Sequence, residues 1–63
     1  MLTDWELWAC AAEVQRQHGE RAPLAVAERI GALVLAGDSD GVAVWRGIAS
    51  RLQALREQPA KPE

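Results

Sequence analysis

The chain has 63 residues, one cysteine and a formal net charge of −2, and these values exclude several kinds of protein. Hydrophobic residues make up 49% and charged residues 25% of the chain, which is typical of a folded domain. Cys10 has no second cysteine for a disulfide, and Cys10 with His18 cannot supply the four ligands of a structural zinc site. The mixed, slightly acidic charge offers no broad positive surface to nucleic acid or an anionic membrane. We expect one small domain without metal or cofactor, stabilised by regular packing or self-association.

The first residues and the longest apolar run indicate where the protein works. Asp4 and Glu6 stand where a secretory signal would carry positive charge and then an apolar segment. The longest nearly apolar stretch, residues 30–37, is far shorter than the ~20 residues of a membrane-spanning helix. One unpaired thiol suits a reducing compartment. We therefore expect a soluble cytoplasmic protein without a membrane partner.

The first predicted helix begins at a capping box. The Thr3 hydroxyl can accept a hydrogen bond from the Glu6 amide, the Glu6 carboxylate can accept one from the Thr3 amide, and Leu2 and Leu7 occupy the positions of a hydrophobic staple. Gly19 is expected to end the helix in a left-handed conformation. At about 100° per residue, the half expected to face the core consists of Trp5, Leu7, Trp8, Ala11, Ala12, Val14 and His18.

The second helix is predicted from Pro23 to Ala36, because proline suits a first helical turn and Gly37 a helix end. Its apolar residues form two adjacent stripes. The first consists of Val26, Ile30, Leu33 and Val34, and the second, called the second stripe below, consists of Leu24, Ala27, Gly31 and Leu35. A middle helix can use both stripes internally against two neighbours. Alternatively the second stripe binds a partner at Gly31, because a helical glycine costs about 1 kcal/mol relative to alanine and suits close approach of another helix.

The third helix is predicted to start at Asp38-Ser39-Asp40, since aspartate caps free amides and opposes the helix dipole, and to run to Arg56. Its buried face is predicted to contain Val42, Val44, Trp45, Ile48, Ala49, Leu52 and Leu55. Residues 58–63 contain two prolines and are predicted to form a disordered tail after a domain spanning residues 1–57. The predicted fold class is therefore all-α, a compact three-helix domain with short connections.

The three tryptophans are the only large rings in the sequence. Because each can bury about 150–250 Å², Trp5, Trp8 and Trp45 are predicted to supply much of the core area. Replacement of a fully buried ring by alanine costs about 3–5 kcal/mol, and this is the loss expected for Trp8→Ala.

Segments spread over most of the chain resemble a known family. They include residues 3–9 (TDWELWA), 18–19, 22–23, 27–33 (AERIGAL), 36–38, Trp45 and 48–52 (IASRL). In these segments the chain is similar to a family of short, uncharacterised proteobacterial proteins. The resemblance implies a stand-alone bacterial protein and supports the helical fold, and it implies no activity, ligand or catalytic residue.

No group of residues has the parts that catalysis or calcium binding needs. If Gly41 were the sixth residue of an EF-hand loop, the first and twelfth positions would be Ala36 and Gly47, which have no side-chain oxygen. Cys10 and His18 lie two helical turns apart, too far for a nucleophile and its base. We therefore expect neither enzymatic activity nor a small-molecule substrate.

The function predicted from the sequence is a non-enzymatic protein-interaction module. Its partner would be another protein or a second copy of the chain, in a homodimer that associates through Leu24, Ala27, Gly31 and Leu35. The alternative is a helix-turn-helix-like DNA-binding regulator, with residues 23–36 and 39–56 as its two helices. Asp38 and Asp40 count against this alternative, because they would meet DNA phosphates with negative charge.

Overall fold

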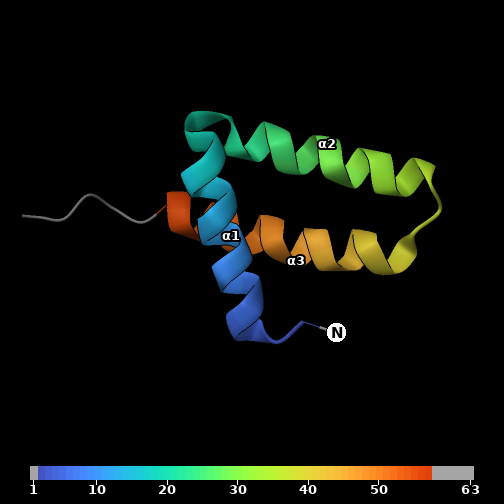
Figure 1. Ribbon diagram of the computed structural model, residues 1–63, viewed down its shortest axis with the longest axis horizontal. Helices are drawn as coiled ribbons and strands as arrows, with labels where there is room; N and C mark the ends of the chain where they lie inside the picture. Colours follow the sequence, from blue (N-terminus) through green and yellow to red (C-terminus); the bar gives the residue numbers. More distant parts are fainter. Residues whose placement is uncertain (1, 58–63) are drawn as a thin grey trace, which may run out of the picture.

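The computed structural model describes residues 2–57, which form three α-helices with short connections (Figure 1). Helix α1 spans Asp4–His18, the short 3₁₀ helix η1 spans Gly19–Arg21, α2 spans Ala22–Leu35 and α3 spans Ser39–Arg56. Residues 2–57 contain no strand, and the all-α, three-helix prediction is confirmed. The tail predicted for residues 58–63 lies outside the described residues.

The ends of α1 follow the local signals in the sequence. Thr3 Oγ1 accepts a hydrogen bond from the Glu6 amide at 3.2 Å, and Glu6 Oε1 accepts one from the Thr3 amide at 2.9 Å, so the capping box is present. Gly19 has the expected positive φ of 58°, but its ψ of −126° lies outside the left-handed helical region. The chain therefore continues directly into η1, and α2 begins one residue earlier than predicted, at the fully buried Ala22.

The turn between α2 and α3 makes a tight hairpin. Gly37 has a φ of 74°, its amide donates to the Val34 carbonyl, and the Asp38 amide donates to the Leu33 carbonyl, both at 3.0 Å. This is a Schellman motif, in which a glycine with positive φ ends a helix. Asp38 Oδ1 then accepts a hydrogen bond from the Gly41 amide at 2.9 Å and caps α3. As a result α2 and α3 run side by side in opposite directions, and α1 lies across α3 on one face of the pair (Figure 1).

The core is built from small and aliphatic side chains, and the prediction of a tryptophan core is wrong. The buried residues are Ala11, Ala22, Val26, Ile48 and Leu52. Trp5 is 75% exposed and Trp8 is 39% exposed, while Trp45 is half-buried at the edge of the core. Helices α1 and α3 approach closely where Leu7 lies on Gly47, and a Cβ atom on that glycine would come within 3.4 Å of Leu7. The three indole rings lie at the edge of this core or outside it.

The buried face of α1 is rotated from the predicted one. Cys10, predicted on the outer half, is half-buried and packs against the core beside Leu7 and Val14. Trp8 instead lies under the Arg51 guanidinium, 5.8 Å from the ring centre. Arg51 also pairs with Asp4 and donates to the Gly47 carbonyl at 2.9 Å. Trp8 and Arg51 therefore hold α1 against α3 from the side.

Candidate interaction surface

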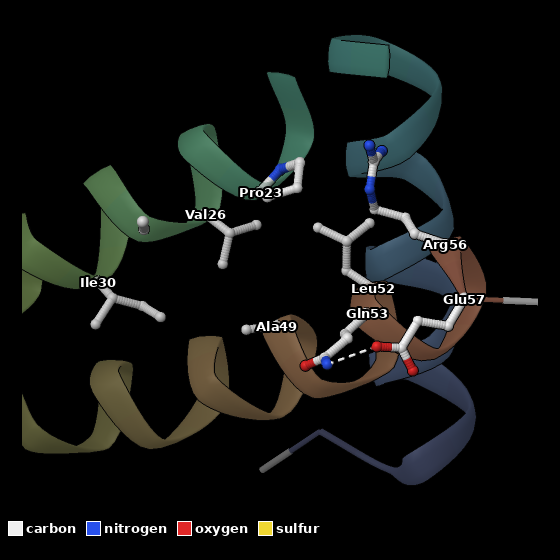
Figure 2. A pocket seen from close by; sticks show the side chains of 9 residues that line it. Pro23, Val26, Ile30, Ala49, Leu52, Gln53, Arg56 and Glu57 are labelled. Atoms are coloured by element: carbon white, nitrogen blue, oxygen red, sulfur yellow. Dashed lines mark hydrogen bonds between the residues drawn. The ribbon is translucent and has the colours of Figure 1, made fainter. Parts of the chain in front are cut away.

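The face of the hairpin opposite α1 carries an open groove between α2 and α3. Figure 2 views this groove from the other side of the hairpin, with α1 behind it. The groove has a volume of about 440 Å³ and is lined by Pro23, Val26, Ala27, Ile30, Ala49, Leu52, Gln53, Arg56 and Glu57. The core residues Val26 and Leu52 point into it from the two helices. Its floor is therefore apolar.

The polar side chains of the groove gather at the end of α3 and already have partners (Figure 2). Gln53 Nε2 donates to Glu57 Oε2 at 2.8 Å. Arg56 Nη1 donates to Gln15 Oε1 at 3.1 Å and to the Gly19 carbonyl at 3.0 Å, which ties the end of α3 to the end of α1. Because these groups already have hydrogen-bond partners within the chain, the groove presents mainly apolar surface to a ligand.

The second stripe lies on the surface of α2. Leu35 is 91% exposed, Leu24 is 48% exposed, and Ala27 and Gly31 are exposed as well. Ala27 also lines the groove, so the stripe and the groove are continuous. These four residues do not serve the core of the single chain, and the interpretation in which both stripes are internal does not fit the structure.

Val34 belongs with this exposed surface, although its spacing in the sequence assigned it to the first stripe. It is 56% exposed. With Val34 included, the exposed residues Leu24, Ala27, Gly31 and Val34 follow a 3-4-3 spacing. That spacing is the heptad pattern of a helix that packs along another helix, and it is the sequence signal that could have identified Val34.

Gly31 is the one glycine within residues 2–57 that has neither a positive φ nor any neighbouring atom near the position of a Cβ atom. Gly19 and Gly37 have positive φ, a Cβ atom at Gly41 would press on Asp38 and Leu33, and one at Gly47 would be in ordinary contact with Leu7 and Arg51. A Cβ atom at Gly31 would meet no atom within 4 Å. The single chain thus keeps a destabilising helical glycine at an open position in the middle of the second stripe.

The other residues considered as candidates for metal binding or catalysis do not form a common site. Asp38 caps α3, as predicted. Cys10 is half-buried and His18 is exposed, and residues 2–57 contain no cluster of three His, Cys, Asp or Glu side chains that could hold a metal ion. Glu13 accepts hydrogen bonds from Arg16 and Gln17 on the exposed side of α1. These bonds, with the Arg16 charge, lower the pKa of the Glu13 carboxyl to about 2.

A comparison with protein families matches residues 3–60 to a family of unknown function, DUF6961. This chain belongs to that family. The resemblance seen in the sequence is thereby confirmed for nearly the whole length of this DUF6961 protein. Searches of curated proteins and of solved structures found no match. Across residues 2–57, no helix of the protein is long and apolar enough to cross a membrane.

Proposed function

We propose that this DUF6961 protein is a protein-interaction module that binds a helix of its partner along the uncovered side of α2. The observation that carries the proposal is the exposed second stripe, with Leu35 91% and Leu24 48% exposed on a helix of 14 residues. Contiguous exposed apolar surface on a small protein commonly marks an interaction site. An apolar groove beside it suits the apolar face of a second helix.

The course of the helices favours this proposal over the DNA-binding alternative. In a helix-turn-helix unit the two helices cross steeply, so that the second can enter the major groove. Here α2 and α3 lie side by side in opposite directions (Figure 1). The N-cap Asp38 and Asp40 in the first turn of α3 would also repel phosphate.

A photo-crosslinking experiment in living cells tests the proposal. A benzophenone amino acid replaces Leu35 in one variant and Ala32 in a matched control. Both side chains are exposed on α2, but Ala32 lies outside the second stripe. We expect irradiation to give covalent protein adducts from position 35 and at least fivefold fewer from position 32, as measured by immunoblot and mass spectrometry.

Two results would count against the interaction surface. Position 35 could give no protein adduct above the dark control, or positions 32 and 35 could give the same adducts in equal yield. In either case the second stripe would not be a binding surface. A circular dichroism spectrum of each variant confirms that the helices are intact.

A further inference from the structure

We infer that the partner on the second stripe is a second copy of this chain, packed with its α2 antiparallel to the first and centred near position 29. This inference rests on the proposed function and names the occupant of its surface. Dimers of identical chains commonly have twofold symmetry, and a twofold interface must be complementary to itself. The sequence of α2 meets that requirement.

Four exposed apolar residues of α2, Leu24, Ala27, Gly31 and Val34, have the same spacing and a similar order of sizes in both directions. Leu24 and Val34 lie five positions on either side of position 29, and Ala27 and Gly31 lie two positions on either side. In an antiparallel pair, Leu24 therefore faces the partner's Val34, and Ala27 faces the partner's Gly31. Large side chains meet large ones in the two outer layers, and small ones meet small ones in the middle.

The middle layers give Gly31 a role. Two helices whose facing residues are alanine and glycine can bring their backbones closer than helices with larger side chains. A Cβ atom at Gly31 would enter open space in the single chain, but in the dimer it would point toward the partner's Ala27. The cost of a helical glycine is thus offset by closer packing between the two copies.

At the two ends of the antiparallel α2 pair, the partner covers Leu35, the most exposed of the large hydrophobic side chains. Leu35 lies six positions from position 29, and so does Pro23, so Leu35 of each copy packs beside the partner's Pro23 at the edge of the groove. Arg21 lies level with the partner's turn at Gly37 and Asp38, which sets a cation near a carboxylate at both ends. Arg29, at the centre of this symmetry, lies over the Trp45 ring of its own chain. The nearest charge at the exposed rim of the interface is therefore Glu28, which meets the partner's Glu28 there.

Sedimentation equilibrium with a matched pair of variants tests the surface. Ala27 and Ala32 are both exposed alanines of α2, and only Ala27 belongs to the second stripe. We expect the unaltered chain and Ala32→Glu to be dimers at 100 μM, and Ala27→Glu to be a monomer with its helical circular dichroism retained. Gly31→Leu, which the single chain has room for, should raise the dimer dissociation constant at least tenfold. A monomeric unaltered chain at 1 mM, or equal dimerisation of the two glutamate variants, would overturn the inference.

Cysteine crosslinking in a Cys10→Ser background tests the antiparallel register. A mixture of the Leu24→Cys and Val34→Cys chains should form the mixed disulfide under mild oxidation, with little of either homodimeric product. Crosslinking of Leu24→Cys to itself without the mixed product would overturn the antiparallel arrangement. Glu28→Gln should lower the dimer dissociation constant by about twofold at low salt, since it removes an exposed like-charge pair, and weaker association of this variant would contradict the register.

The failure of this inference can be distinguished from the failure of the proposed function. Crosslinks from position 35 to a different protein, together with a monomeric purified chain, would overturn the homodimer and leave the interaction module standing. The absence of adducts from position 35 would overturn both.

Discussion

At the scale of single residues, Trp8 stabilises the fold from its edge. One face of the ring lies against Arg51, which also bonds Asp4 and the Gly47 carbonyl. Trp5, one turn earlier, is 75% exposed. Loss of the Trp8 ring therefore removes a contact between α1 and α3, whereas loss of the Trp5 ring removes a mostly solvent-exposed side chain.

We expect Trp8→Ala to cost about 2 kcal/mol of unfolding free energy, less than the 3–5 kcal/mol of a fully buried ring, because 39% of the side chain is already exposed. Trp5→Ala should change the free energy of unfolding by no more than about 0.5 kcal/mol. Urea denaturation followed by circular dichroism measures both. An equal loss for the two variants would show that Trp5 contributes to the core in solution.

The positions of the tryptophans show where sequence reasoning stops at this scale. Helical periodicity places Trp5 and Trp8 on the same half of α1 as Ala11, but of these three residues only Ala11 is buried. Which part of that half touches α3 depends on the close contact of Leu7 with Gly47. That contact joins residues far apart in the chain, and no local pattern specifies it.

At the scale of the helix, the ends were predictable and the buried faces were only partly so. The capping box at Thr3, the Schellman turn at Gly37 and the cap at Asp38 each depend on residues within a few positions of one another. Such short-range signals act before tertiary packing and survive it. Whether Val34 is buried or exposed depends on which side of α2 packs against α3, and this is a property of the assembled fold.

The surface of α1 predicts a pH dependence. Because hydrogen bonds from Arg16 and Gln17 favour the ionised Glu13 carboxylate, its pKa in the folded chain is about 2, below the ordinary value of 4.5. The unfolded chain therefore binds more protons between these two values, and stability rises with pH across that window. The contribution is fully present above pH 4.5 and is lost as the pH falls toward 2.

Comparison of the unaltered chain with Glu13→Gln between pH 2 and pH 5 tests this effect. Glutamine does not titrate, so part of the acid-induced loss of stability should be absent from the variant, as measured by urea denaturation at each pH. The difference should be small, because the pair is exposed to solvent. A Glu13 carboxyl that titrates near pH 4.5 in a carbon-detected NMR experiment would contradict the hydrogen bonds.

At the scale of the whole molecule, the all-α class and the order of the helices could be predicted from the spacing of apolar residues and from the capping residues, proline and glycines at the helix ends. Which face of the hairpin α1 covers could not, because both faces of α2 are apolar and the sequence gives no direction of approach. The sequence therefore allows two positions for the second stripe, inside the core or on the surface. In the structure Leu24 and Leu35 are exposed on the surface of α2, and the role of this surface in binding remains a prediction.

The bonds between α1 and α3 have a consequence for the order in which the chain folds. Arg51 and Asp4 are 47 residues apart, and Arg56 and Gln15 are 41 residues apart. The hairpin turn closes through bonds spanning only a few residues, at Leu33, Asp38 and Gly41. Short loops close at a lower entropic cost than long ones, so the α2–α3 hairpin should form before α1 docks.

Stopped-flow kinetics of Arg51→Ala measure that order. Since Arg51 acts at the late contact, the variant should unfold severalfold faster and refold at nearly the unaltered rate. A refolding rate that falls as much as the unfolding rate rises would place α1 docking in the rate-limiting step. If α1 docks last, the hairpin exists briefly with both of its apolar faces open to solvent, and a newly made chain is then most prone to pair with the wrong surface of its neighbour.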